Sequence, residues 1–133
     1  MIFIDSNVPM YLVGASHPNK TAAQQWLEVA IGQRTPLVTD AEVLQEILHR
    51  YVAIHRPDAI RPATDVLLQL VDDVLPITRD DVLRARDLVL AEPGRPSARD
   101  AIHLAVMRAH GIRRIFTFDR DFDGLPDIER EHA

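Results

Sequence analysis

The sequence contains no cysteine among its 133 residues. This absence excludes disulfide bridges, iron–sulfur clusters, thiolate zinc sites and a cysteine nucleophile. The sequence also lacks any apolar run near the roughly 20 residues that a membrane-spanning helix needs. Asp5 interrupts the apolar run at the N-terminus. We therefore expect no signal peptide and no membrane segment, and we predict a soluble protein of the reducing cytoplasm.

Phosphate-cradling loops are missing as well. Neither a G-x-x-x-x-G-K-[ST] nor a G-x-G-x-x-G string occurs, so nothing indicates a nucleotide-binding loop. The formal net charge of −5 argues against a nucleic-acid-binding protein that works by overall charge. Arginine supplies every basic residue except Lys20. Arginine pairs well with phosphate, but isolated surface arginines more commonly form ion pairs.

The composition fits a single domain spanning residues 1–133. With 47% hydrophobic residues, a chain of this length can bury its own core. Short apolar runs typical of buried strands alternate with amphipathic segments typical of helices. We predict strands at 2–4, 37–38, 74–77 and 114–118, the last being the final strand. The alternation predicts an α/β fold, a three-layer α/β/α domain with a short parallel sheet.

The predicted helices lie after Asp5 and near 20–32, 40–51, 63–70, 78–89 and 100–109. Residues that can cap them are Ser6 or Asn7, Thr39 or Asp40, Thr78, and Ser97. Apolar residues at helical spacing are expected to face the core, among them Ile31, Leu48, Val82 and Leu83. The helix near 100–109 is apolar nearly all round, which predicts a buried central helix.

Three aspartates stand where an apolar run begins or ends. Asp5 follows the run 2–4, Asp119 follows the run 115–118, and Asp100 precedes the run 101–107. Parallel α/β sheets bind ligands beyond the carboxyl ends of their strands. Asp5 and Asp119 are therefore expected to face one cleft. Carboxylates gathered in a cleft raise one another's pKa, so a cluster that stays ionised near neutral pH predicts a bound cation.

Two of these aspartates also have a purely structural interpretation. Asp5 could cap the following helix, but Ser6 and Asn7 would serve equally well, which favours a functional role for Asp5. The segment from Ser97 to Asp100 resembles a capping box, and the helix dipole favours an acid in a first turn. Asp100 on its own fits either interpretation. The apolar helix behind it favours a position in the interior cleft.

The segment after Asp119 carries two further acids, Asp121 and Asp123. The string D-x-D-x-D-G at 119–124 matches the first half of an EF-hand calcium loop. However, Arg130 stands where the loop needs a bidentate glutamate. A strand rather than a helix also precedes the string, so we reject the EF-hand. Asp119 is the acid most naturally placed to face the cleft.

A fourth acid is expected from the helix that starts near Asp40. On a helical wheel, Glu46 lies nearer the apolar stripe of this helix than Glu42 does. Both could instead be ordinary surface acids. We take Glu46 as the better candidate and leave the contribution of Glu42 open.

Other polar residues carry weaker signals. Thr117 could offer its hydroxyl group to a metal-bound water, although β-branched residues are frequent in strands. His49, His55 and His103 show no metal-binding spacing, so core or surface positions are expected for them. Trp26 fits a core or an interface.

Four motifs occur in order along the chain: Asp5 after the first strand, LQEIL at 44–48, DAIHLA at 100–105 and TFDRDF at 117–122. Together with the chain length, they resemble a PIN-domain protein, specifically the VapC-type toxin ribonucleases of bacterial toxin–antitoxin pairs. The resemblance covers essentially the whole chain. Each motif alone is weakly specific, and their shared order and spacing make the combination fairly specific. The fold it implies is a doubly wound α/β/α domain.

The resemblance also implies a metal site and a reaction, the hydrolysis of RNA by an endoribonuclease that uses Mg²⁺ or Mn²⁺. The acids that match the family's catalytic metal ligands are Asp5, Glu46, Asp100 and Asp119. Thr117 would support them, and Asp123 is a candidate for a second metal position. Mg²⁺ prefers hard oxygen ligands. A bound metal can activate a water nucleophile and clamp the attacking and leaving oxygens of a phosphodiester displacement.

Partners are implied in the same way: an RNA substrate, a second copy of the chain in a homodimer, and an inhibitory antitoxin protein. Arg99 and Arg120 could hold the RNA backbone, or could form ion pairs with neighbouring acids. Two alternatives stay open, a non-catalytic PIN-like interaction module and a metal-dependent phosphate-handling aspartate enzyme. The second is less favoured, because Asn7 stands where haloacid-dehalogenase phosphatases need a second aspartate.

Overall fold

The computed structural model describes residues 1–131, so the last two residues of the expected domain lie outside the described residues. The strands are β1 (Ile2–Ile4), β2 (Leu37–Asp40), β3 (Asp73–Leu75), β4 (Arg114–Phe116) and β5 (Glu129–Glu131). The α-helices are α1 (Asn7–Val13), α2 (Pro18–Gly32), α3 (Ala41–Ala53), α4 (Ile60–Leu70), α5 (Arg79–Ala91) and α6 (Ala98–Ala109). Two 3₁₀ turns complete the described part, η1 (Pro57–Ala59) and η2 (Arg120–Phe122).

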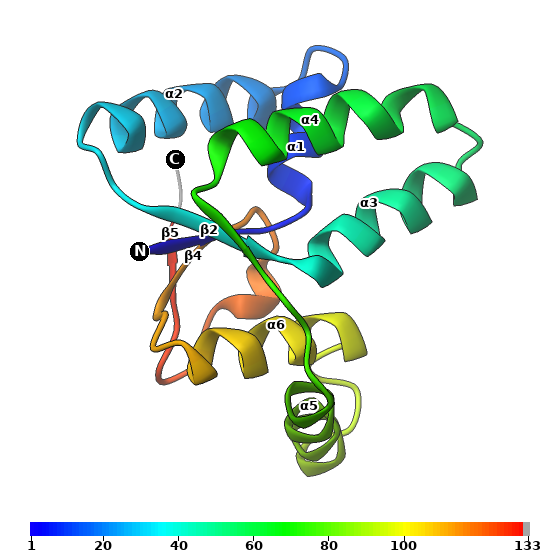
Figure 1. The fold of residues 1–133 in the computed structure, drawn as a ribbon, viewed down its shortest axis with the longest axis vertical. Coiled ribbons are helices and arrows are strands. Elements are labelled where there is room, and N and C mark those ends of the chain that lie inside the picture. Colours follow the sequence, from blue (N-terminus) through cyan, green and yellow to red (C-terminus); the bar gives the residue numbers. More distant parts are fainter. Residues whose placement is uncertain (132–133) are drawn as a thin grey trace.

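The strands form one parallel sheet in the order β3-β2-β1-β4-β5. From the central strand β1 the chain moves outward through β2 and β3, and then returns to the other side of β1 through β4 and β5 (Figure 1). The strand order therefore reverses between β1 and β4. In open α/β sheets, the crevice beyond the carboxyl ends of the strands at such a reversal is the usual ligand site.

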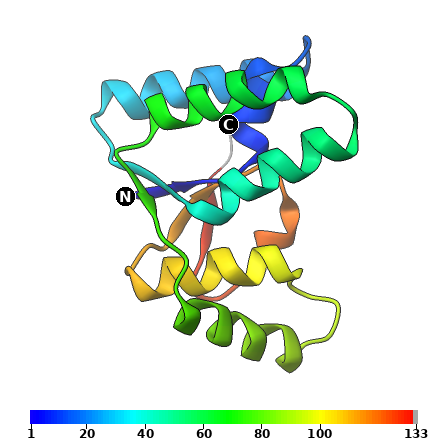
Figure 2. The ribbon, with the colours of Figure 1, turned by 45° about the vertical axis from the view of Figure 1, so that its right-hand side comes forward.

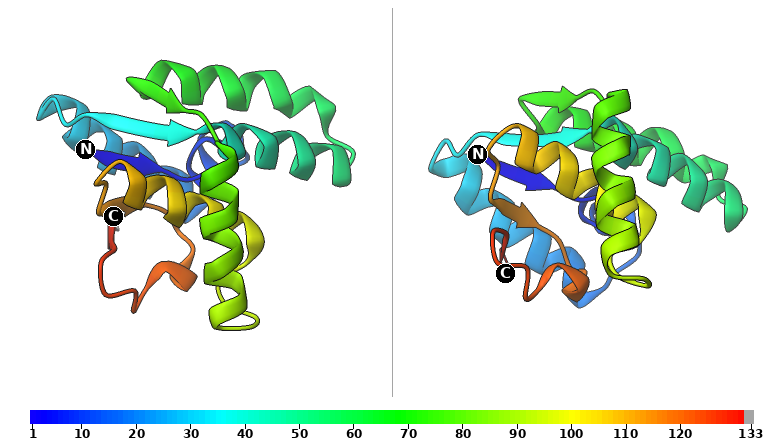
Figure 3. Two further views of the ribbon diagram at one scale, coloured as in Figure 1. Left: turned by 60° about the horizontal axis from the view of Figure 1, so that its bottom comes forward. Right: turned by 90° about the horizontal axis from the view of Figure 1, so that it is seen from below.

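Helices cover both faces of the sheet. Helix α1 packs against both α2 and α4 on one side, and α6 lies on the other side (Figures 1 and 2). Helix α5 packs on α6 and forms the outer edge of that layer (Figure 3). The predicted three-layer α/β/α architecture with a short parallel sheet is therefore confirmed.

The core forms where apolar strand residues meet the helices. Phe3 and Ile115 on neighbouring strands are fully buried, as are Leu67 of α4 and Met107 of α6. Helix α6 is buried along most of its length, as its composition predicts. No helix within residues 1–131 combines the length and the apolar character needed to cross a membrane.

Several helix predictions needed correction. Ile31, Leu48, Val82 and Leu83 are exposed rather than turned to the core. Each belongs to a helix of which only a narrow stripe of residues is buried against the rest of the domain. In α5, for example, Ala85 is the buried apolar residue, so the stripe that contacts α6 is narrower than the apolar pattern suggests.

The last strand was also predicted wrongly. The expected strand at 114–118 ends at Phe116, and β5 then adds a further parallel strand beside β4. The sequence of β5 is Glu-Arg-Glu. An edge strand has one unpaired side and needs no apolar face, and charged residues protect such an edge from further pairing. A polar edge strand of this kind leaves no hydrophobic pattern to detect.

Candidate active site

Asp5 lies directly beyond β1, at the centre of the carboxyl edge of the sheet. Its side chain is buried, because β1 itself is enclosed on both faces. The backbone N–H of Ser6 donates to Asp5 Oδ1 at 2.8 Å, and the Thr117 hydroxyl donates to Asp5 Oδ2 at 2.7 Å. Burial and the nearby Glu46 carboxylate raise the pKa of Asp5 despite these hydrogen bonds and the charge of His103.

Glu46 comes from the second turn of α3, which begins where β2 ends. Asp40 caps this helix by accepting from the Val43 N–H at 3.0 Å. Glu46 is buried, and the Ser6 hydroxyl donates to its Oε2 at 2.6 Å. Glu42 of the same helix is half-buried. Of these two acids, Glu46 is the one that lines the cavity described below.

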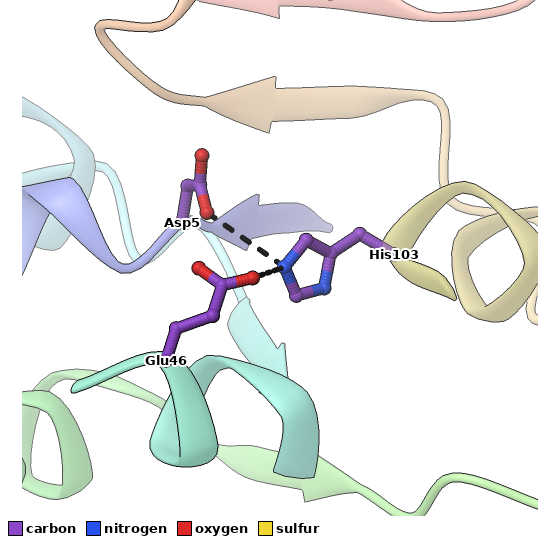
Figure 4. Close-up of side chains that lie close together, drawn as sticks. All are labelled: Asp5, Glu46 and His103. Carbon is purple, nitrogen blue, oxygen red and sulfur yellow. Dashed lines mark hydrogen bonds and ion pairs between the residues drawn. The ribbon is translucent and has the colours of Figure 1, made fainter. Parts of the chain in front are cut away.

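His103 of α6 is fully buried between three carboxylates. Its Nδ1 lies 2.8 Å from Asp40 Oδ2. Its Nε2 lies 2.6 Å from Glu46 Oε1 and 3.9 Å from Asp5 Oδ1 (Figure 4). Burial lowers the pKa of His103, but the bonds to Asp40 and Glu46 outweigh it and hold that pKa well above the usual value. Both ring nitrogens of His103 therefore face carboxylate oxygens, an arrangement that favours the protonated ring, in which each nitrogen donates.

This buried cation has the opposite effect on Glu46. Burial alone would raise the pKa of Glu46, whereas the hydrogen bond and charge of His103 outweigh that effect and lower it. Glu46 therefore stays ionised. An isolated buried carboxylate would be costly, and a well-bonded charge pair offsets much of that cost.

Asp100 lies in the first turn of α6, three residues before His103 and on the same side of the helix. The Asp100 N–H donates to the Ser97 cap at 3.2 Å, as the capping pattern predicts. Burial and the negative charges of Asp5 and Asp119 raise the pKa of Asp100 to about 6, against the smaller opposing effect of His103. Its carboxylate lies beside those of Asp119 and Asp121, and within residues 1–131 it forms no ion pair.

Asp119 follows β4 after two further residues and caps the turn η2. Its Oδ1 accepts from the Asp121 N–H at 2.9 Å. One carboxylate oxygen each of Asp100, Asp119 and Asp121 lie within 4.8 Å of one another. Asp121 therefore joins the two predicted acids.

Thr117 connects the two strands that flank the strand reversal. Besides donating to Asp5, its hydroxyl oxygen accepts from Asn7 Nδ2 at 2.9 Å and from the Asp119 N–H at 3.0 Å. Asn7 in turn accepts from the Phe118 N–H at 3.3 Å. This network ties Asp5 to the loop that carries Asp119.

All four predicted acids line one cavity of about 710 Å³. The residues from the prediction that the structure brings together there are Asp5, Glu46, Asp100, Asp119 and Arg99. Arg120 is exposed and is not among the lining residues. Arg50 of α3 also lines the cavity. Neither Arg50 nor Arg99 forms an ion pair with another of the residues 1–131.

Asp123, the candidate for a second metal position, lies apart from this group. Arg130 of β5 bonds both of its carboxylate oxygens, at 2.7 and 3.3 Å. The same guanidinium also donates to the Thr117 carbonyl oxygen at 3.2 Å. Asp123 thus helps to anchor the loop, and Asp121 rather than Asp123 lies beside Asp100 and Asp119.

The donor set fits a hard divalent cation. Asp100, Asp119 and Asp121 offer carboxylate oxygens, which Mg²⁺ and Mn²⁺ accept and soft metals do not favour. The pKa of Asp100 is raised first by burial and then by the negative charges of Asp5 and Asp119, and a divalent cation would neutralise that charge. Asp5, Glu46 and His103 also place one possible ligand atom each close together, but both nitrogens of His103 already contact carboxylates, those of Asp40 and Glu46, which favours His103 as a hydrogen-bond donor.

Sequence reasoning missed several residues of this site, above all His103 and Asp40. Metal-like spacing is the wrong test for His103, since its partners are carboxylates on other elements. A usable signal was present: His103 is the one ionisable side chain in the apolar stretch 101–107. Such a residue needs a partner in the core.

The whole chain resembles known proteins. A family model described as PIN domain matches residues 2–128. Ribonuclease VapC13 of Mycobacterium tuberculosis is 59% identical over 130 residues, covering 98% of each chain.

Two solved structures extend the comparison. The crystal structure of Mycobacterium tuberculosis VapC20, a sarcin–ricin loop cleaving toxin, matches with a TM-score of 0.79 and 26% identity, covering 97% of this chain and 98% of that one. A chain of a toxin–antitoxin complex from Klebsiella pneumoniae shares the fold, with a TM-score of 0.68, 21% identity, and coverage of 97% and 96%. The chain described here belongs to the PIN-domain family, in its group of VapC ribonucleases.

Proposed function

We propose that this protein is a Mg²⁺- or Mn²⁺-dependent endoribonuclease, the toxin component of a type II toxin–antitoxin pair. One observation carries the proposal: four acids from separate segments of the chain line a single cavity at the strand reversal. The high identity to proteins named as VapC ribonucleases supports the reaction and the RNA substrate.

The proposed catalytic ligands are Asp5, Glu46, Asp100 and Asp119, with Asp121 as an additional carboxylate. When bound there, a divalent cation supplies charge neutralisation and activates water for attack on the phosphodiester. His103 and Ser6 orient Glu46 through short hydrogen bonds. Thr117 orients Asp5 and the Asp119 loop. These contacts support a preorganised set of carboxylate oxygens that would hold a divalent cation beside the phosphodiester.

Arg50 and Arg99 are proposed to hold phosphates of the RNA backbone. Both line the cavity, and neither is neutralised by an ion pair within the described chain. Arginine's planar fork suits bidentate phosphate contacts. Arg120 is kept as a weaker candidate, because it is exposed next to Asp119 and Asp121 but does not line the cavity.

An antitoxin partner and a homodimer are also proposed. The descriptions of structural neighbours as toxins and toxin–antitoxin complexes support the antitoxin. Exposed apolar side chains one helical turn apart on α3, Leu48 and Val52, offer surface that a protein partner could cover. Light scattering of the isolated protein and of a copurified complex would test both assemblies.

The reaction is tested with purified protein freed of any antitoxin. We expect calorimetric Mn²⁺ binding and metal-dependent cleavage of cellular RNA, with both greatly weakened in Asp5→Asn and Asp100→Asn. Cleavage that persists in excess EDTA would remove the metal mechanism. Metal binding without RNA cleavage would favour the non-catalytic module instead. Thr78→Ala, which alters a cap on the distant α5, is the matched control for general loss of folding.

A further inference from the structure

An aromatic series runs from the core to the rim of the cavity. Trp26 of α2 stacks on Phe116 of β4 at a ring-centroid distance of 4.0 Å, and Phe116 lies 5.5 Å from Phe118. Phe118 meets Tyr11 edge-on at 5.2 Å, and Tyr11 lies 4.9 Å from His17, with 34° between the ring planes. Tyr11 and His17 line the same cavity as the acids.

The segment that presents these two rings is held in place by its own hydrogen bonds. The Asn19 N–H donates to His17 Nδ1 at 3.0 Å, which makes His17 the cap of α2. Lys20 Nζ donates to the Gly14 carbonyl oxygen at 2.9 Å, and the Lys20 N–H donates to the His17 carbonyl oxygen at 3.0 Å. The hydrogen bonds of Lys20 thus hold the segment from Gly14 to His17 at the edge of the cavity. The His17 ring is exposed while its orientation is fixed.

We infer that Tyr11 and His17 form a stacking subsite for one unpaired RNA base next to the scissile phosphate. The inference rests on the proposed ribonuclease function. Base faces stack readily on aromatic rings, and a stack of this kind tolerates any base. The rings share the cavity with the acid cluster and with Arg50, so a nucleotide whose phosphate reaches the acids has its base within reach of the rim.

This subsite restricts the substrate to unpaired RNA. In an A-form duplex the base faces are covered by their neighbours, and proteins read duplex RNA by its shape and backbone. A base can lie on His17 only when it is splayed out of a loop, a bulge or a single strand. Tyr11 and His17 are therefore positioning residues for the nucleotide, and Asp5 with its partner acids acts on the phosphate.

The test uses a short uridine-rich RNA with one central 2-aminopurine, whose fluorescence falls on stacking. The full-length protein is titrated into the RNA in Ca²⁺ for binding, and cleavage of the same RNA is followed in Mg²⁺. His17→Asn keeps an oxygen that can cap α2 but removes the ring, whereas His17→Phe keeps an aromatic face. His49→Asn makes the same change on an exposed part of α3 outside the cavity. Thermal unfolding of each variant checks the fold.

We expect quenching and tight binding with the wild type, His17→Phe and His49→Asn. His17→Asn should lose the quenching and bind about 5- to 150-fold more weakly, the range that one base–aromatic stack contributes. Equal quenching and affinity in wild type and His17→Asn would overturn the subsite. Equal binding of the same RNA after annealing to its complementary strand would overturn it as well. Stacking and binding without any Mg²⁺-dependent cleavage would support the subsite and contradict the proposed reaction.

Discussion

Nε2 of His103 lies 2.6 Å from Oε1 of Glu46, and both side chains are buried. The other nitrogen of the same ring bonds Asp40, the cap of α3. One ring from α6 therefore fixes both the start of α3 and the acid in its second turn. The arrangement makes a buried cation part of an acidic site and keeps Glu46 ionised without a metal.

Removal of His103 should destabilise the protein strongly. His103→Ala leaves Asp40 and Glu46 buried without their common donor, and breaking a buried charge pair costs about 3–5 kcal/mol. Urea denaturation of the metal-free protein should show this loss, while His49→Ala, an exposed change on α3, should leave the midpoint unchanged. A His103→Ala protein as stable as wild type would mean that the ring is not the imidazolium described here.

Asp100 should make the metal-free protein less stable as the pH rises. Its pKa is raised from 3.8 to about 6 in the folded state. Between these values the folded protein binds more protons than the unfolded chain, so stability falls as the pH increases through this window. Relative to wild type in EDTA, Asp100→Asn should gain about 1–2 kcal/mol at pH 7, after allowance for partial exposure. The gain should disappear near pH 4.

The same proton competes with the metal. Carboxylate ligands must be deprotonated to bind a cation, so Mn²⁺ affinity measured by calorimetry should weaken as the pH falls through about 6. Asp100→Asn should bind more weakly at every pH, with a smaller pH dependence. A Mn²⁺ affinity in wild type that stays constant from pH 7 to pH 5 would argue against Asp100 as a ligand.

Thr117→Val tests the hydroxyl at the strand reversal without changing the side-chain shape. The valine leaves Asp5, Asn7 and the Asp119 N–H without their shared partner, at a cost to stability of about 1–3 kcal/mol. We expect weaker Mn²⁺ binding and slower RNA cleavage, with both largely restored in Thr117→Ser. Full activity in Thr117→Val would show that the network is not needed to position the acids.

Charge at the cavity should appear in the salt dependence of RNA binding. If Arg50 and Arg99 each contact one phosphate, Arg50→Gln or Arg99→Gln should reduce the slope of log affinity against log salt by about 0.7 for single-stranded RNA. Arg61→Gln, an exposed change on α4, is the matched control. Arg120→Gln should have a smaller effect, since Arg120 lies outside the cavity lining.

The N-terminal cap of α5, which lies outside the cavity, should contribute to stability in a pH-dependent way. Asp81 is buried, and although burial would raise its pKa, the Thr78 and Arg84 hydrogen bonds outweigh it and lower that pKa. Its contribution to stability is therefore present above the unfolded pKa of 3.8 and is lost as the pH falls through the lower folded value. Thr78→Ala should cost about 1 kcal/mol at pH 7, with RNA cleavage unchanged.

Much of the fold was accessible from the sequence, because the buried strands are nearly continuous apolar runs. The caps at Asp40, Thr78 and Ser97 carry local signals that the structure confirms. Strand β5 could not be predicted, because a charged edge strand of three residues shows no alternation of apolar and polar residues. The exposed Leu48 and Val82 show a second limit. An apolar stripe predicts which side of a helix faces the core, but not how much of that side other elements cover.

The acids that line the cavity could be predicted from the sequence, but the residues that hydrogen-bond to them could not. Asp5 follows directly from the end of a strand, Asp119 lies two residues further from its strand than expected, and the helical wheel separated Glu46 from Glu42. The role of His103 depends on Asp40 and Glu46, which lie 63 and 57 residues away along the chain, and no local pattern reports such contacts. The sequence favoured Asp123 over Asp121 as an additional metal ligand, whereas the structure places Asp121 beside Asp100 and Asp119. The Arg130 contact on the late strand β5 separates Asp123 from Asp121.

The strand order also has a consequence for biosynthesis. Asp5 and Thr117, 112 residues apart in the sequence, form a hydrogen bond, and Arg130 of the edge strand donates to the Thr117 carbonyl oxygen. During translation the first acid emerges early, yet the strand that must lie beside it emerges among the last. A ribosome-bound chain therefore holds scattered acids rather than an assembled cavity, so a toxic activity would begin after release and not beside the ribosome that makes it.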